Sequence, residues 1–206
     1  GERPCVVFVF GGGFARGTRD KEMDMPYFEF LLGEGYDVVS IDYRLGMKGV
    51  NSPGVIDFFK LLDHSIDIAV EDLFRATNFI LDHADEWQIN REQIVVSGSS
   101  AGAITVLQGE YIISNSLPMS EVLPKGFNYA GVISFAGAIF SLDGAPRWGE
   151  NTAPILLFHG NADRQVPYNK VALFGYGMYG SKYLAEKLQK ADLPYWFYTV
   201  EDETHQ

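Results

Sequence analysis

The chain has 206 residues, which is enough for one substantial hydrophobic core and short for two. Its 27 acidic and 16 basic side chains give a formal net charge of −11, which argues against nucleic acids and anionic membranes as partners, because both require a basic surface. No apolar run approaches the roughly 20 residues of a membrane span, and the single cysteine, Cys5, excludes an internal disulfide.

Six short segments rich in β-branched and aromatic residues predict buried strands. In chain order they are residues 5–10, 37–41, 93–97, 129–135, 155–158 and 195–200. Helices are expected over about 66–86, after Ser100, and over about 180–191. Strands that alternate with helices predict an α/β fold, with a mainly parallel sheet of about six strands and helices on both faces.

Two connections between these elements are irregular, and both contain proline. They cover residues 45–62 and 114–128. Long loops above a sheet usually serve as lids or pocket walls, and we expect that role here. The alternative is that either segment is a surface excursion without a role. The whole of 1–206 is expected to form a single domain.

The run Gly98-Ser99-Ser100-Ala101-Gly102 follows the third predicted strand and precedes a helix. This G-x-S-x-G pattern is typical of a nucleophile elbow, in which a tight strand-to-helix turn exposes the serine hydroxyl. Glycine at both ends of the turn leaves room for the strand and helix that pack against it. Ser100 is therefore the candidate nucleophile, beside the free N–H groups of a helix N-terminus.

A serine hydroxyl needs a base within hydrogen-bond reach. Of the four histidines, His64 and His83 are interpreted as surface or capping residues. His159 ends the fifth predicted strand, and His205 lies in the loop after the sixth. In doubly wound sheets, catalytic and ligand-binding residues lie beyond the carboxyl ends of the strands, which favours His205 as the base. His159 is the competing base, although its place on the strand itself favours a role in supporting the turn.

The base in turn needs an acid that orients it. Asp163 lies in the loop after the fifth predicted strand and is the favoured acid. Asp202 and Glu203 are close to His205 in sequence, but one short loop can hardly supply both partners. The turn at residues 11–14 contains three consecutive glycines and is expected to form an oxyanion hole. A flexible loop is the alternative, and a phosphate loop is disfavoured because its motifs are absent.

Five motifs lie in a fixed order over nearly the whole chain. They are Phe10-Gly11-Gly12-Gly13-Phe14, Asp42-Tyr43-Arg44-Leu45, Gly98-Ser99-Ser100-Ala101-Gly102, His159-Gly160-Asn161-Ala162-Asp163 with Val166-Pro167, and His205. Together they resemble the α/β-hydrolase superfamily, specifically its carboxylesterase and hormone-sensitive-lipase-like branch. In that superfamily the order Ser100, Asp163, His205 is the chain order of a catalytic triad.

The resemblance implies further roles. Gly12, Gly13 and Ala101 would donate backbone hydrogen bonds to the oxyanion, and the segment 42–44 would hold the glycine turn. Phe10 departs from the superfamily pattern, because a histidine or tyrosine usually stands there and fixes the loop through hydrogen bonds. No metal and no cofactor are expected.

Members of the superfamily normally carry an antiparallel strand pair before the first strand found here and a helix after the catalytic histidine. We therefore expect 1–206 to be part of a longer protein, truncated at both ends. The sheet order should then be 4-3-5-6-7-8 in superfamily numbering, with strand 37–41 as an unprotected edge that favours a homodimer. The start without Met indicates a processed or recombinant chain, so a cytoplasmic, periplasmic or secreted location stays open.

The predicted reaction is hydrolysis of a small-molecule or carbohydrate ester through an acyl-enzyme. Short-chain or aromatic acyl groups are expected, because the candidate pocket is apolar and partly aromatic. The chain resembles bacterial esterases that remove acetyl or feruloyl groups from xylan-type glycans. The candidate pocket residues, all assigned to loops at the catalytic edge, are Phe14, Met47, Phe140, Val166 and Tyr168.

Three other functions share this fold. A prolyl-oligopeptidase-like peptidase usually has a propeller domain and an aromatic residue before the nucleophile, where this chain has Ser99. A kynurenine-formamidase-like amidase would share the glycine turn. A binding module of the cholinesterase-like adhesion type would have the fold without the triad, which the retained triad residues disfavour.

Overall fold

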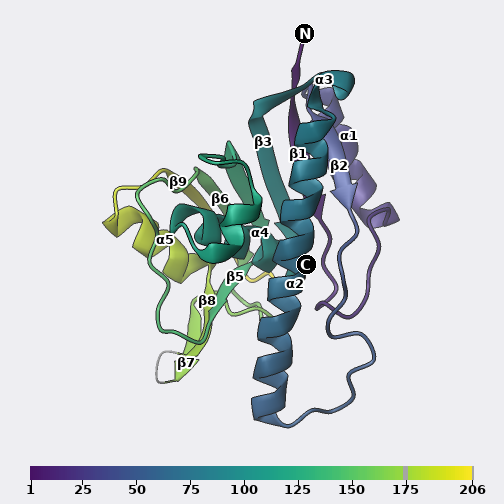
Figure 1. The fold of residues 1–206 in the computed structure, drawn as a ribbon. Coiled ribbons are helices and arrows are strands. Elements are labelled where there is room, and N and C mark those ends of the chain that lie inside the picture. The colour runs from purple at the N-terminus through teal and green to yellow at the C-terminus, as the bar shows by residue number, and fades with distance from the viewer. Residues whose placement is uncertain (174–175, 206) are drawn as a thin grey trace.

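A six-stranded parallel sheet forms the centre of the molecule in the computed structural model, which describes residues 1–173 and 176–205 (Figure 1). Its strands lie in the order β2-β1-β3-β4-β6-β9. They are β1 (Arg3–Val9), β2 (Asp37–Ile41), β3 (Ile89–Ser99), β4 (Gly131–Phe135), β6 (Ile155–Gly160) and β9 (Tyr195–Val200). The predicted α/β class and the predicted strand order, with β2 at one edge, are therefore confirmed.

The register of the sheet brings the carboxyl ends of its strands to one edge. Val9 at the end of β1 pairs with Ile41 of β2 and with Gly98 of β3. Phe135 at the end of β4 pairs with Ser99 and with Phe158 of β6. The loops that leave these strands therefore start side by side, although they come from distant parts of the chain.

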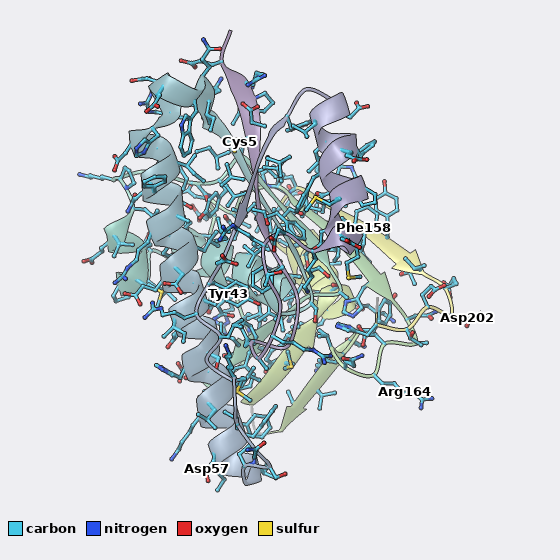
Figure 2. The ribbon with its side chains drawn as sticks, turned by 90° about the vertical axis from the view of Figure 1, so that its right-hand side faces the viewer. Cys5, Tyr43, Asp57, Phe158, Arg164 and Asp202 are labelled. Atoms are coloured by element: carbon cyan, nitrogen blue, oxygen red, sulfur yellow. The ribbon has the colours of Figure 1, made fainter. Side chains whose placement is uncertain are left out.

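Helices cover both faces of the sheet. On one face, Tyr27 and Phe28 of α1 contact the ring of Phe8 in β1. On the opposite side of the strands lies the long helix α2 (Figure 2). The helices are α1 (Met25–Gly33), α2 (Val55–Asp82), α3 (Ala84–Trp87), α4 (Ala101–Ser114) and α5 (Ser181–Lys190), with 3-10 turns η1 (Glu22–Asp24) and η2 (Pro118–Val122). Among the described residues, no helix has both the length and the apolar character required to span a membrane.

The core between α2 and α4 depends on a close approach of the two helices. Leu73 and Phe74 of α2 are fully buried. A Cβ on Gly109 of α4 would lie 3.4 Å from each of these two side chains, which is van der Waals contact, so both side chains pack directly on the backbone of α4 there. The apolar stripe that predicted an amphipathic helix is thus the surface that α2 packs against α4.

The predicted start of the long helix at about residue 66 is wrong. α2 begins at Val55, directly after Gly54 at its N-cap, and runs for 28 residues. The second half of the predicted irregular connection 45–62 is therefore the first two turns of this helix. The apolar stripe in the sequence does not extend over these turns, because Val55, Ile56 and their apolar neighbours are largely exposed.

Two further features were not predicted. α1 lies between β1 and β2, and a second sheet has the order β5-β8-β7 with antiparallel pairing. The strands of this sheet are β5 (Ala138–Ser141), β7 (Lys170–Leu173) and β8 (Tyr176–Gly180). Strands of four or five residues carry little periodic signal, and the β5–β8 pairing joins segments that are distant in sequence.

We expect Leu73→Ala to destabilise the protein by about 3 kcal/mol, because it leaves a cavity in the contact between α2 and α4. The matched control is Ile56→Ala on the same helix, where the side chain is 71% exposed and the cost should stay below about 0.5 kcal/mol. Urea denaturation of both variants measures the difference. Equal losses in the two variants would contradict this account of the core.

Candidate active site

The candidate catalytic residues lie on loops at the carboxyl edge of the sheet. Ser100 lies between β3 and α4, Asp163 follows β6, and His205 follows β9. The glycine turn at residues 11–13 follows β1. Four segments that are far apart in the sequence thus meet where the parallel strands end, as the rule for doubly wound sheets predicts.

Ser100 occupies a strained turn. Its φ of 54° and ψ of −117° are unusual for a residue with a side chain, and its N–H donates to the carbonyl of Phe135 at 2.9 Å. The turn is possible because its flanks are glycines. A Cβ on Gly98 would overlap the backbone of Gly102, and a Cβ on Gly102 would overlap the carbonyl oxygen of Val9. The G-x-S-x-G spacing is therefore a packing requirement of β1, β3 and α4.

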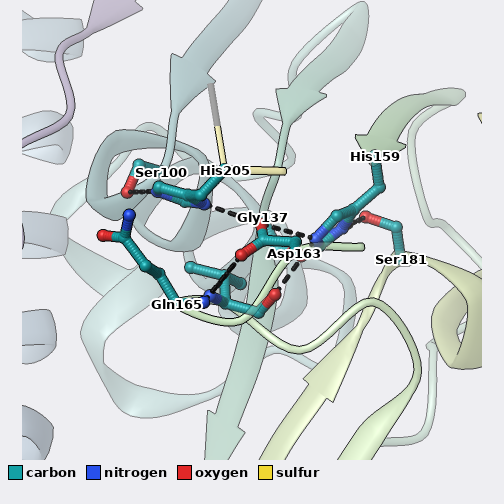
Figure 3. A network of polar contacts seen from close by, with 8 residues as sticks. Ser100, Gly137, His159, Asp163, Gln165, Ser181 and His205 are labelled. Carbon is teal, nitrogen blue, oxygen red and sulfur yellow. Dashed lines mark hydrogen bonds and ion pairs between the residues drawn. The ribbon is translucent and has the colours of Figure 1, made fainter. Parts of the chain in front are cut away.

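Ser100, His205 and Asp163 form a continuous hydrogen-bonded chain (Figure 3). The Oγ of Ser100 lies 2.7 Å from Nε2 of His205. Nδ1 of His205 lies 2.6 Å from Oδ2 of Asp163, and the carboxylate is fully buried. Since the carboxylate accepts from Nδ1, Nε2 of the neutral ring is free to accept the proton of the serine hydroxyl.

The buried carboxylate of Asp163 is stabilised by its local turn. Burial alone would raise the pKa of Asp163, but the hydrogen bond from His205 and two backbone donors outweigh it and lower the pKa. The N–H of Gln165 donates to Oδ1 at 2.8 Å, and the N–H of Val166 donates to the same oxygen at 3.0 Å. The acid is therefore ionised at neutral pH.

His159, the competing base, contacts the same carboxylate from another side. Its Nε2 lies 3.2 Å from Oδ2 of Asp163, and its Nδ1 lies 2.8 Å from Oγ of Ser181 (Figure 3). The ring is only 1% exposed. The structure thus places His205, and not His159, against the serine hydroxyl.

The glycine turn is shaped for close approach to the elbow. Gly12 has a φ of 139° and Gly13 a φ of 63°, both in the region that favours glycine. A Cβ on Gly11 would lie 2.8 Å from the carbonyl oxygen of Ser99. Ala101 is the first residue of α4, so its N–H has no acceptor within the helix. The residues predicted to donate to an oxyanion, Gly12, Gly13 and Ala101, line the same cavity as Ser100.

The turn is held although Phe10 stands where the superfamily usually has a hydrogen-bonding residue. The Tyr43 hydroxyl donates to the carbonyl of Phe10 at 2.9 Å. Nζ of Lys21 donates to the carbonyl of Gly11 at 2.8 Å and lies 5.4 Å from the centre of the Phe10 ring. Arg44 forms ion pairs with acidic side chains of α2, which anchors the segment that carries Tyr43. No motif in the sequence indicates this role of Lys21.

A cavity of about 800 Å³ opens at Ser100. Of the predicted pocket residues, Phe14, Met47 and Val166 line it. The assignment of Phe140 to a loop is wrong, because this residue is buried in β5, where its ring stacks on Phe59. Tyr168 is not among the described residues that line the cavity, and its hydroxyl is hydrogen-bonded to that of Thr199 at 2.6 Å.

Several cavity-lining side chains were not predicted. They come from the loop after β1 with η1, from the start of α2, from α4, from the loop after β6 and from β8, and all depend on the tertiary arrangement. The apolar ones are Met23, Phe58, Leu62, Ile104 and Met178, and the polar ones are Arg16, Lys21, Asp24 and Gln165. The segment 114–128 lines a different cavity of about 660 Å³. Within the described part of the chain, no group of three potential ligands could hold a metal ion.

A family model and curated relatives both match the N-terminal half of the chain. The model of the BD-FAE family matches residues 1–112. Esterase LipI from Mycobacterium tuberculosis is 31% identical over 101 residues, which are 49% of this chain and 27% of LipI. Esterase B1 from Culex pipiens is 27% identical over 108 residues, which are 50% of this chain and 18% of that protein. The matches thus span about a quarter or less of the length of these relatives.

Solved structures match the whole chain. Esterase 2 from Thermogutta terrifontis, with propionate bound, superimposes with a TM-score of 0.67 at 22% identity, over 99% of this chain and 74% of that one. MGS-M1, an α/β-hydrolase from a deep-sea metagenome library of the Medee basin, superimposes with a TM-score of 0.65 at 21% identity. The superposition covers 100% of this chain and 71% of MGS-M1. At these identities the similarity establishes a shared fold.

The lowered pKa of Asp163 has a consequence for stability. A carboxyl whose pKa is lower in the folded state stabilises the fold above its unfolded pKa of about 3.9, and this contribution is lost as the pH falls through the folded value. Asp163→Asn should therefore lower Tm more at about pH 6 than at about pH 3. Calorimetry at both pH values checks this, with exposed Asp20→Asn as the control. A loss of Tm independent of pH would contradict the assignment.

Proposed function

Because this chain belongs to the BD-FAE family and has the α/β-hydrolase fold, we propose that it is a serine carboxylesterase. The observation that carries the proposal is the chain of short contacts from Ser100 through His205 to the buried Asp163, at the wall of a cavity. The relatives named as esterases, LipI and esterase B1, support the same reaction class.

In the proposed reaction, His205 Nε2 takes the proton of Ser100 while Oγ attacks the ester carbonyl carbon. The carbonyl π bond breaks, and the backbone N–H groups of Gly12, Gly13 and Ala101 stabilise the resulting oxyanion. His205 then gives its proton to the leaving alcohol as the C–O bond breaks, which leaves an acyl group on the serine oxygen. A water molecule activated by His205 hydrolyses this acyl-enzyme in the same two stages.

The side chains that line the cavity suggest where the acyl and alcohol parts of an ester would bind. Apolar side chains such as Phe58, Leu62 and Ile104 suit a short or aromatic acyl group. Arg16 and Gln165 on the same cavity suit an alcohol that carries hydroxyl groups. We therefore propose acetyl or feruloyl esters of plant polysaccharide as substrates. Thermogutta esterase 2, which has the same fold, is known with propionate bound, and this supports a short acyl group.

The first test is hydrolysis of 4-nitrophenyl acetate by the protein and by Ser100→Ala. Removal of the nucleophile should lower kcat by about 10⁴-fold or more. Ser97→Ala is the control, because Ser97 lies on β3, which leads into the nucleophile elbow, forms a hydrogen bond with Tyr27 and does not line the cavity. The kcat of this variant should stay within about twofold of that of the unsubstituted protein. Equal activity of the protein and Ser100→Ala would overturn the serine mechanism.

Covalent labelling tests the nucleophile independently of turnover. Paraoxon phosphorylates Thermogutta esterase 2, and we expect it to phosphorylate this protein on Ser100. Intact-mass spectrometry should show one diethylphosphoryl group on the protein and on Ser97→Ala, and none on Ser100→Ala. A label on any other residue would assign the nucleophile elsewhere.

The proposed preference for short acyl groups predicts that kcat/KM declines as the acyl chain of the substrate becomes longer. Hydrolysis of 4-nitrophenyl acetate and butyrate should exceed that of the octanoate in kcat/KM, and acetate and ferulate should be released from acetylated and feruloylated xylan. A formanilide measured in parallel detects an amidase. Faster hydrolysis of the octanoate would contradict the short-acyl assignment, and faster hydrolysis of the formanilide would favour the amidase.

A further inference from the structure

We propose that His159 is a positioning residue that donates its Nε2–H to Asp163 and thereby sets the proton affinity of His205. The inference rests on the proposed function, in which His205 is the base. It goes beyond the triad because the carboxylate is then shared between two imidazole rings. One ring, His205, reacts, and the other, His159, is buried and stays in place.

The hydrogen-bond partners of His159 determine where its proton lies. Nε2 faces two oxygens that can only accept, Oδ2 of Asp163 and the carbonyl oxygen of Val166, both at 3.2 Å. A lone pair on Nε2 would be repelled by both oxygens, so this nitrogen must carry the hydrogen. The N–H is then shared between the carboxylate and the backbone of the same turn.

The other side of the ring accepts a hydrogen bond. The Ser181 hydroxyl lies 2.8 Å from Nδ1 of His159 and 3.3 Å from the carbonyl oxygen of Gly137, and it can donate its one hydrogen to the nearer acceptor, Nδ1 (Figure 3). Ser181 begins α5 and is fully buried. A neutral ring with the hydrogen on Nε2 therefore gives each of its two nitrogens a hydrogen-bond partner.

Burial favours this neutral form. It lowers the pKa of His159, and the adjacent Asp163 carboxylate only partly opposes that shift. The titratable side chains that face the ring are Asp163, His205 and Tyr168, whose ring meets it edge-on at 5.7 Å. From α5 and the segment before β5, the described contacts are the neutral Ser181 hydroxyl and, through it, the Gly137 carbonyl.

The shared carboxylate couples the two histidines. Oδ1 of Asp163 accepts two backbone N–H groups, and Oδ2 accepts one N–H from each ring. A donor from His159 stabilises negative charge on Oδ2 and so weakens its pull on a proton at His205. Loss of that donor should raise the pKa of His205 and move the acid limb of the kcat/KM profile to higher pH.

Two matched variants separate this role from a packing role. In His159→Gln, the side-chain amide nitrogen can reach the place of Nε2 and keep the bond to Asp163. In His159→Asn, the shorter side chain reaches only the Nδ1 side, towards Ser181. The readout is the pKa of His205, from the pH titration of its imidazole carbon and proton NMR signals, which are assigned by their loss in His205→Gln.

We expect the His205 pKa to rise by about half a pH unit in His159→Asn and to stay near that of the unsubstituted protein in His159→Gln. The acid limb of kcat/KM for 4-nitrophenyl acetate should shift with it. A folded His159→Asn with an unchanged His205 pKa would overturn the proposal and leave His159 a packing residue.

If His159→Asn does not fold, the unsubstituted protein decides. The nitrogen NMR chemical shifts of the His159 ring show which nitrogen carries the hydrogen, and we expect it on Nε2. A hydrogen on Nδ1 would overturn the proposal. Because the NMR titration does not require turnover, a protein without esterase activity would refute the proposed function alone.

Discussion

The site depends on one buried charge. An ionised carboxylate is costly to remove from water unless donors surround it, and the fold surrounds Asp163 with four. Two of these donors come from its own turn, one from β6 itself and one from the segment after β9. The charge can therefore be accommodated only when both strands are in register. The parallel pairing of His159 with Thr199 provides that register.

A second constraint acts at the other end of the triad. The strained backbone of Ser100 persists because β1, β3 and α4 are packed too closely for any side chain at Gly98 or Gly102. The same closeness brings the glycine turn after β1 against Ser99. The nucleophile and the expected oxyanion donors are therefore products of one packing contact, and the core beneath them supplies its rigidity.

Support for the glycine turn comes from residues outside the motif. Lys21 and Tyr43 bond to the carbonyls of Gly11 and Phe10, and Arg44 ties the following segment to α2. An aromatic residue at Phe10 is compatible with an ordered turn because its ring lies under the Lys21 ammonium and beside the ring of Tyr43. Side chains from two segments, one with Lys21 and one with Tyr43, thus hold the backbone of this turn through its carbonyl groups.

The sequence by itself determined the six strands of the parallel sheet and the three residues that meet at the site, Ser100, His205 and Asp163. These follow from local signals, namely apolar runs, glycine at sterically closed turns, and catalytic residue types placed after strand ends. The order of the strands was implied by the resemblance to the α/β-hydrolase superfamily. Tertiary structure alone decided the start of α2, the β5-β8-β7 sheet, the burial of Phe140 and the polar contacts of His159. Each of these features depends on contacts between segments that are distant in the chain. Such contacts stabilise the structure without producing a periodic pattern in the local sequence.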